Sequence, residues 1–245
     1  MAEKKPSTNV RMSREDRIAS ILVKAKRHLG RVGHENFSPV EVAQDCGVSE
    51  ATIYRYFASR HDLLVHVAEF WVEELLVGAP VLKEHDSIYD RLRQVIWYSL
   101  WVIYSEPALS KFVLMVIRSE PDFRSSRIYA LNKRFTSHTK MVIEDAINQG
   151  VFRSDVPASM VRNMIFGTIE HEVWSYLQAG VDFSLDGSAD LITDIVFKGL
   201  AVEPPVDVEV FNRSMAAIEK GVKEIDAAMK QLQGTAADEK PLHLD

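Results

Sequence analysis

The chain has 245 residues, of which 47% are hydrophobic and 26% are charged, a composition typical of a globular protein. The formal net charge of −6 excludes a protein that binds a polyanion with its whole surface, and the single cysteine excludes an intrachain disulfide and a cysteine-cluster metal site. The charge is uneven, because residues 1–60 contain 11 Lys and Arg against 7 Asp and Glu, whereas the remainder contains 18 against 28. We therefore predict a basic N-terminal head that meets an anion and an acidic body that does not.

The sequence shows no sign of export or of membrane insertion. No apolar segment of the kind found in secretory signals follows Met1, and the longest strongly apolar run, residues 95–104, is too short to span a bilayer. We therefore expect a soluble, cytoplasmic protein that has no membrane partner.

The predicted elements begin after a polar arm, residues 1–12, which we expect to be flexible and basic. Apolar residues at helical spacing then predict an amphipathic helix over residues 14–31. Ser38, followed by a proline, is a typical helix start, and the short helix that it begins ends at Gly47.

A second short helix follows the glycine turn, with Ser49 as its N-cap, and Ser59 caps a longer helix after it. Two short helices that are joined by a tight turn and preceded by a third helix make a helix-turn-helix. We therefore predict a helix-turn-helix DNA-binding head over residues 13–60.

The second short helix has two different faces. Ile53 and Phe57 are four residues apart, so they share a face and must point into the small core of the head. Ala51 and Arg55 lie opposite that face, with Thr52 and Tyr54 beside them. A small side chain, a guanidinium, a hydroxyl and a phenol can approach base edges and phosphates in a major groove, so this outward face is the candidate for DNA contact.

The rest of the chain is predicted to be helical, because its apolar residues keep helical spacing and no stretch alternates as a strand does. Proline and glycine mark the breaks, and the predicted helices lie near residues 87–104, 107–119, 124–149, 157–179 and 187–200. The predicted fold class is therefore all-α, with a helical effector-binding and dimerisation domain over residues 61–203.

An additional helix is predicted over residues 206–232, where apolar residues recur at spacings of three and four through more than three heptads. Its single apolar stripe must be covered by the body of its own chain or by a partner. The final residues, 233–245, are predicted to be disordered.

The motif VAQDCGVSEATIYRYFASRHDLL, residues 42–64, resembles the DNA-binding signature of the TetR family of bacterial transcriptional regulators. The matching positions are Gly47, Val48, Ser49, Thr52, Ile53, Tyr54, Tyr56 and Phe57. The resemblance covers about residues 14–76 and implies that residues 49–56 form the recognition helix.

The resemblance also implies roles for single residues. Ser38 caps the supporting helix, and Tyr54, Tyr56 and Arg60 contact phosphates, with Arg60 standing where the family usually has a lysine. Glu50 and Arg55 occupy variable positions of the motif and are candidates for base discrimination. An alternative for Tyr54 and Tyr56 is aromatic packing between helices. The DNA-binding candidates are Ser38, Ser49, Glu50, Ala51, Thr52, Tyr54, Arg55, Tyr56 and Arg60.

A single head buries only roughly 600–1,000 Å² on DNA, which is little for specific binding, and two-fold pairing would supply a second half-site about 34 Å away. The resemblance implies a homodimer that is formed mainly by the predicted helices 157–179 and 187–200. The apolar candidates are Val161, Ile165, Val173 and Leu177 on the first helix and Leu191, Ile195 and Val196 on the second. Core packing within one chain explains these residues equally well.

The resemblance further implies that a small molecule enters the helical body and changes the spacing between the two heads. Large apolar walls with a few polar anchors would suit a hydrophobic ligand that has one polar group. The effector-binding candidates are Trp97, Trp101, Tyr104, Met115, Asn132, Phe166, Glu170 and Trp174. Ordinary core packing is the alternative for the aromatic residues of this set.

Residues 148–177 resemble the corresponding stretch of TetR-type regulators of fatty-acid degradation, which sense acyl-CoA. This resemblance implies a long apolar tunnel and an acyl thioester effector, with Arg118 or Arg127 as a phosphate partner. A multidrug-type or another hydrophobic effector, or no ligand, are the alternatives.

The predicted function is therefore a ligand-responsive repressor that binds a palindromic operator as a homodimer. An enzyme is the rival class, in which His138, His171 and Glu170 would act as acid and base groups, but no catalytic motif accompanies them. We accordingly predict no catalytic residue, no cofactor and no metal. A helical interaction module that uses residues 206–232 to hold another protein is the remaining alternative.

Overall fold

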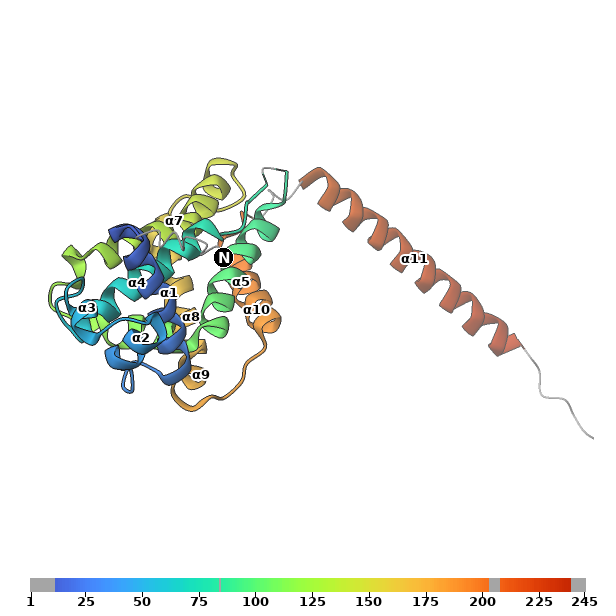
Figure 1. The fold of residues 1–245 in the computed structure, drawn as a ribbon. Coiled ribbons are helices and arrows are strands. Elements are labelled where there is room, and N and C mark those ends of the chain that lie inside the picture. The colour runs from blue at the N-terminus through green and yellow to red at the C-terminus, as the bar shows by residue number, and fades with distance from the viewer. Residues whose placement is uncertain (1–11, 84, 203–207, 239–245) are drawn as a thin grey trace, which may run out of the picture. The chain divides into compact units, whose positions relative to one another are not determined.

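The computed structural model describes residues 12–83, 85–202 and 208–238. The chain divides after Val202 into a large unit and a short C-terminal unit, and each is described by itself. The described residues form helices and turns without a strand, apart from one isolated antiparallel bridge between Phe152 and Ala201 (Figure 1). The predicted all-α fold class is confirmed.

Three helices form the head, and their caps are those that the sequence predicted. They are α1 (Arg14–Val32), α2 (Pro39–Cys46) and α3 (Glu50–Tyr54). The Ser38 hydroxyl accepts the N–H of Glu41 at 3.4 Å, and the Ser49 hydroxyl accepts the N–H of Thr52 at 3.3 Å. Gly47 ends α2 with φ 65° and ψ 35°, a left-handed conformation that residues with a Cβ rarely adopt. The tight turn between α2 and α3 therefore depends on this glycine.

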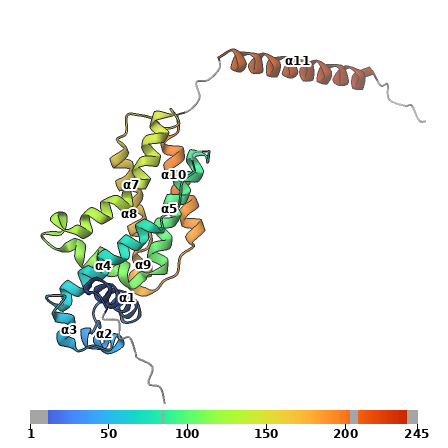
Figure 2. The ribbon, with the colours of Figure 1, turned by 45° about the horizontal axis from the view of Figure 1, so that its top comes forward.

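The body, as far as the large unit is described, consists of seven further helices and two short 3₁₀ turns. They are α4 (Arg60–Val77), α5 (Ile88–Ser105), α6 (Pro107–Met115), η1 (Ile117–Ser119), η2 (Phe123–Ser125), α7 (Arg127–Asn148), α8 (Ala158–Glu172), α9 (Trp174–Ala179) and α10 (Leu185–Leu200). Figure 2 shows α2 and α3 at the end of the large unit that lies away from α10.

Two predicted helices differ in their bounds. The helix expected over 124–149 begins at Arg127, because the Ser126 hydroxyl accepts the N–H of Tyr129 at 3.3 Å and so caps α7 there. The helix expected over 157–179 is divided at Val173 into α8 and α9. The N–H of Val173 bonds to the carbonyl of Ile169 at 3.0 Å, and its carbonyl accepts the N–H of Leu177 at 3.0 Å, so helical hydrogen bonding continues on both sides of the division.

Two apolar clusters hold the large unit together, and α4 belongs to the cluster of the head. The first cluster packs α1, α2, α3 and α4 with α6 and the beginning of α7, and the second packs α5, the rest of α7, α8, α9 and α10. The predicted division between residues 60 and 61 thus falls at the start of a helix whose buried residues Leu63, Leu64 and Val67 lie in the core of the head.

The C-terminal unit contains α11 (Val208–Asp238). This helix includes the predicted segment 208–232 and also residues 233–238, for which the sequence predicted disorder, so that prediction was wrong. Helical hydrogen bonding continues there because helix-forming Ala236 and Ala237 follow Gly234. The predicted arm, residues 1–12, and the predicted tail fall outside the described residues at 1–11 and 239–245.

Among the described residues, no single helix has both the length and the apolar composition needed to cross a bilayer. The segments Ile88–Ser105 and Pro107–Ser119 meet those two criteria only when they are taken together, across a bend of 102°.

Candidate DNA-binding surface and effector cavity

Helix α3, the predicted recognition helix, is oriented as its periodicity predicted. Ile53 and Phe57 are 0% and 2% exposed and lie in the core of the head. Ala51 and Arg55 are exposed on the opposite face, and Tyr54 is 42% exposed. The α3 helix therefore presents a small residue, a guanidinium and a phenol to solvent while two apolar side chains anchor it from behind.

Tyr56 lies between two arginines. The Arg14 and Arg55 guanidinium carbons are 5.9 Å and 5.2 Å from the centre of its ring, and Arg55 Nη2 donates a hydrogen bond of 3.4 Å to its hydroxyl. Tyr56 also packs against the apolar cluster of the head, as the alternative reading of the sequence expected. Sequence reasoning missed Arg14, whose only signal was the basic character of the N-terminal segment. The phosphate contacts of Tyr56 and Tyr54 remain predictions.

Arg60 holds the loop between α1 and α2. Its guanidinium donates to three backbone carbonyls, those of Phe37 at 2.9 Å, Glu35 at 3.2 Å and His34. These carbonyls belong to residues between two helices, so they lack intrahelical partners and the arginine satisfies them. The sequence assigned Arg60 to a phosphate, and that contact remains a prediction, while the structure gives the side chain a structural role that the sequence did not reveal.

We expect Arg60→Ala to lower the free energy of unfolding by about 1–2 kcal/mol, because it removes charged hydrogen bonds to three carbonyls. Equilibrium urea unfolding followed by circular dichroism measures the change. Arg27→Ala is the control. The Arg27 side chain is exposed and its ion pair with the exposed Asp45 is 3.5 Å long, so the substitution should lower the free energy of unfolding by less than about 0.5 kcal/mol. Unchanged stability of Arg60→Ala, together with a flatter salt dependence of DNA binding, would favour the phosphate contact instead.

A buried histidine joins α1 to α2. His28 is 2% exposed, and its Nε2 accepts the N–H of Ser38, the N-cap of α2, at 3.2 Å. The imidazole edge also packs against the Phe37 ring, with centroids 5.3 Å apart. His28 thereby fixes where α2 starts, and nothing in its sequence neighbourhood identified it. Burial also raises the pKa of the Cys46 thiol at the end of α2, and this side chain packs against the apolar cluster of the head.

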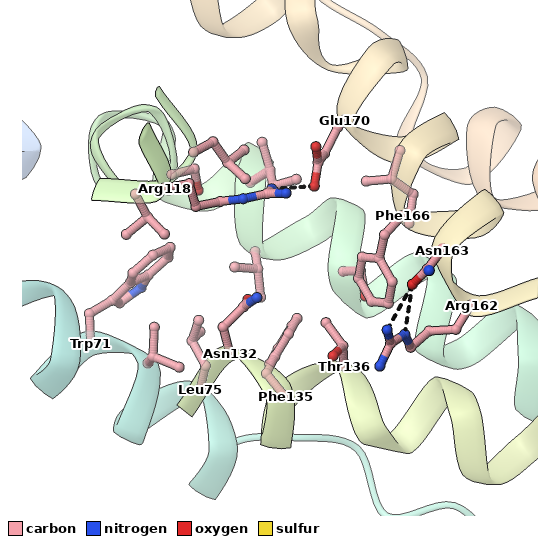
Figure 3. Close-up of a pocket in the computed structure, with 18 residues that line it drawn as sticks. Trp71, Leu75, Arg118, Asn132, Phe135, Thr136, Arg162, Asn163, Phe166 and Glu170 are labelled. Atoms are coloured by element: carbon pink, nitrogen blue, oxygen red, sulfur yellow. Dashed lines mark hydrogen bonds and ion pairs between the residues drawn. The ribbon is translucent and has the colours of Figure 1, made fainter. Parts of the chain in front are cut away.

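A cavity of about 220 Å³ lies inside the body, between α4, α5, α6, α7 and α8. Figure 3 shows the labelled side chains of α4, α7 and α8, with Arg118 of η1, around this cavity. Its apolar walls are Trp71, Val72, Leu75, Val102, Ile103, Val113, Leu114, Phe135, Phe166 and Ile169. Of the predicted effector residues, Asn132, Phe166 and Glu170 line this cavity.

Polar groups enter the cavity wall at a few points. Arg118 pairs with Glu170, and Arg162 Nη2 donates to Asn163 Oδ1 at 2.7 Å (Figure 3). Ser110 is 2% exposed, and in the described part of the chain its hydroxyl has no hydrogen-bond partner. A buried hydroxyl without a partner is costly, so a ligand that supplies an acceptor or donor there would gain affinity.

Five predicted effector residues lie outside the cavity. Trp97 and Trp101 stack along an outer groove, with centroids 6.4 Å apart, and the Trp97 indole N–H donates to Asp186 on α10 at 3.1 Å. The inward face of α5 instead carries Ser99, Val102 and Ile103. Helical spacing showed that the two tryptophans share one face of α5, but it could not show which face of α5 lines the cavity.

The other three are held by different contacts. The Tyr104 ring stacks on Tyr176 with centroids 5.5 Å apart, and Met115 Sδ accepts from Gln178 Nε2 at 3.2 Å. Trp174 is 54% exposed. On α5 and α6 other side chains line the cavity, and α9 contributes none, so Tyr104, Met115 and Trp174 do not line it, contrary to their predicted placement.

The expected phosphate partner Arg127 also lies elsewhere. It pairs with Glu69 at 3.0 Å and with Glu73, and so ties α7 to α4. Glu69 is 7% exposed, and burial of a carboxylate requires such a partner. Arg127 is therefore a structural residue, whereas Arg118 does line the cavity.

The apolar residues of α8, Val173, α9 and α10 divide into two groups. Val161, Ile165, Val173 and Leu177 are buried in the core of their own chain, as the alternative reading allowed. Leu191 and Ile195 on α10 are 65% and 71% exposed, and Met160 and Met164 on α8 are 56% and 58% exposed. Two exposed apolar stripes thus lie on helices that contact each other.

The three residues of the enzyme alternative have different surroundings, and His138 lines another hollow than Glu170 does. Glu170 is engaged by Arg118, and His171 is exposed. Within the described ranges, no three His, Cys, Asp or Glu side chains are grouped so as to hold a metal ion.

The fold and these sites define a class of protein, namely a DNA-binding transcriptional regulator with a helical ligand-binding body. The comparison with known families agrees with this class. A model of bacterial regulatory proteins of the tetR family matches residues 21–67, and a model of the C-terminal region of YsiA-like proteins matches residues 75–199. The chain belongs to the tetR family of ligand-responsive transcriptional regulators.

Several relatives are similar over most of their length. The fatty acid metabolism regulator protein of Bacillus subtilis is 19% identical over 169 residues, which are 69% of this chain and 87% of the relative. The nucleoid occlusion factor SlmA of a Marinomonas species is 22% identical over 169 residues, which are 68% and 85% of the two chains.

Solved structures share the fold. The transcriptional regulator FadR of Bacillus subtilis, in complex with stearoyl-CoA, has a TM-score of 0.60 at 20% identity, covering 74% of this chain and 98% of that one. The fatty acid degradation regulator FadR of Bacillus halodurans has a TM-score of 0.62 at 17% identity, with the same coverage.

Proposed function

We propose that the chain is a homodimeric repressor that binds a palindromic operator through two heads and is released by an acyl thioester, acyl-CoA, held in the cavity. The observation that carries this proposal is that one helix, α4, belongs both to the core of the head and to the wall of the cavity. A ligand in the cavity therefore touches the element on which the head is built.

The coupling follows from the two ends of α4. Leu63, Leu64 and Val67 pack in the head, and about two turns later Trp71 and Leu75 line the cavity. A ligand that fits only when α4 moves aside binds the displaced state better than the closed one. It therefore shifts the population of head positions by its difference in affinity for the two states.

The chemistry of the lining supports an amphipathic, anionic effector. Apolar walls suit an acyl chain, and Arg118 and Arg162 suit the phosphates of a coenzyme A moiety. A structural neighbour of the same fold is described in complex with stearoyl-CoA. The polar groups at Ser110 and Asn132 would then meet the thioester or another oxygen of the ligand.

The direct test is release from DNA. An operator recovered by in vitro selection is titrated with protein, and palmitoyl-CoA, octanoyl-CoA, coenzyme A and free palmitate are each added to the complex. Release by an acyl-CoA but not by coenzyme A or palmitate supports the proposal. Release by palmitate as effectively as by palmitoyl-CoA would identify a hydrophobic effector of another kind.

We expect Ser110→Ala to weaken binding of the effector by up to about 10-fold, because it removes one hydrogen bond to the ligand. Isothermal titration with palmitoyl-CoA measures the change. Ser99→Ala is the matched control, since Ser99 lines the same cavity but its hydroxyl already bonds to the Val95 carbonyl at 2.8 Å. Equal effects of the two substitutions would show that Ser110 makes no specific contact.

A further inference from the structure

The helix α11 carries an exposed apolar stripe that the regulator function does not use. Figure 2 shows α11 as one uninterrupted helix. The stripe consists of Met215, Ile218, Val222, Ile225 and Met229, whose exposed fractions run from 41% to 64%. Their spacings of three and four residues repeat without interruption, and the sequence continues the pattern to Val208, Phe211 and Leu232. An exposed stripe of this length requires a covering surface.

We propose that this stripe pairs with α11 of a second copy of the chain as a parallel two-stranded coiled coil. In the heptad notation Met215, Val222 and Met229 are a positions, and Ile218 and Ile225 are d positions. The opposite face is solvated, and there Lys220 and Glu224 form an ion pair at 3.7 Å. The helix therefore has the one-sided pattern of a coiled-coil strand.

The edges of the stripe decide the orientation. The e edge is acidic at Glu219 and Asp226, whereas the g edge is small and uncharged at Ser214, Gly221 and Ala228. In a parallel pair each e residue faces a g residue of the other helix, so each carboxylate meets a neutral side chain. In an antiparallel pair e faces e, and the carboxylates of the two helices would repel one another. The parallel arrangement is therefore favoured.

The α11 helices of two chains can meet if the chains form the proposed homodimer, and on this point the inference rests on the proposed function. Residues 201–207 connect α10 to α11, and such a segment spans at most about 25 Å when extended. Two α11 helices carried by one dimer thus meet at a high effective concentration, which stabilises a short coiled coil that would be weak in isolation. Gly221 lowers the helix propensity of a lone α11, so pairing also supports the helix itself.

Disulfide trapping tests the pairing in the full-length chain. Cys46→Ser removes the native thiol, and Val222→Cys or Ala227→Cys then adds one at the stripe or on the solvated face. In a parallel coil the two cysteines at position 222 face each other, so mild oxidation at low micromolar concentration should link most of the chains within minutes. Cysteines at position 227 should stay unlinked. Equal linking at both positions, or none at position 222, overturns the proposal.

The alternative occupants give different outcomes. If α11 covered its own body, the thiol of Val222→Cys would be shielded from a maleimide reagent and would not form a disulfide. If the pair were antiparallel, chains with one cysteine at position 215 would link to chains with one at position 232 rather than to each other. Either result contradicts the parallel coil.

Mass measurement separates this inference from the proposed dimer of the body. In a light-scattering dilution series, full-length Ile218→Asp/Ile225→Asp should dissociate into monomers at a protein concentration at least about 10-fold higher than the unsubstituted chain does, because the body interface then holds the dimer alone. Dissociation at the same concentration as the unsubstituted chain overturns the coil. Leu191→Glu/Ile195→Glu tests the body interface in the same series: an unchanged dimer would place that interface elsewhere, and the disulfide test would still decide on the coil.

Discussion

Phe57→Ala is expected to lower the free energy of unfolding by about 3–5 kcal/mol and to abolish operator binding. The side chain is 2% exposed and packs beneath α3 with Ile53, and the head has only a small core to compensate for its loss. Urea unfolding of the variant measures the stability, and fluorescence anisotropy with a labelled operator measures the binding. Because the core of the head continues into α4, the destabilisation should be visible in the unfolding of the whole large unit.

Arg55→Ala is the matched control for Phe57→Ala, because it lies two residues away on the opposite face. Its stability should change by no more than about 0.5 kcal/mol, while its affinity for the specific operator should fall by about 10- to 100-fold. The affinity for unrelated DNA should fall far less. Arg55 is expected to contact a base in the complex with the specific operator, and no such base contact exists in the complex with unrelated DNA. A variant at Arg55 that unfolds as easily as the variant at Phe57 would contradict the orientation of α3.

The second large effect is expected from Leu191→Glu/Ile195→Glu, which should weaken operator binding by about 100-fold or more. Both side chains are more than half exposed on α10, and carboxylates in a buried dimer interface would be unpaired. Without that interface the two heads lose their fixed spacing, so two half-sites can no longer be bound as one rigid unit. Anisotropy titration with one half-site and with the full palindrome measures the loss.

Val77→Glu/Val81→Glu provides the control for the α10 variant. These valines are 89% and 84% exposed, so the substitution adds the same two charges at exposed apolar positions that do not belong to α8 or α10. It should leave the preference for the full palindrome unchanged. If the α10 variant also kept that preference, the apolar stripe on α10 would not be the dimer interface.

The head was predictable because its signals are local. The serines at 38 and 49 cap helices whose first N–H groups lie three residues away, and Gly47 supplies a left-handed turn at its own position. Ile53 and Phe57 are separated by one helical turn, so the face that they share follows from the helix alone. None of these features depends on a distant part of the chain.

The cavity was only partly predictable, because it lies where several helices meet. The predicted residues Asn132, Phe166 and Glu170 do line the cavity, and their contact with an effector stays a prediction. Trp97 and Trp101 were misplaced, because their spacing shows a stripe without showing its direction. Ser110 could not be predicted from the sequence. It is a candidate because its hydroxyl is buried without a hydrogen-bond partner among the described residues, and only the packing of several helices shows this.

Taken by itself, the sequence determined the all-α class, the caps and turn of the head, the outward face of α3 and the heptads of α11. Only the tertiary structure decided which side of α5 lines the cavity, that Arg60 and Arg127 serve as structural ties, and which apolar residues of α8 and α10 stay exposed. The physical reason is that helical periodicity and capping depend on residues within about one turn of one another. What a helix face packs against, and whether a charged side chain finds its partner, depends on residues brought together from distant parts of the chain.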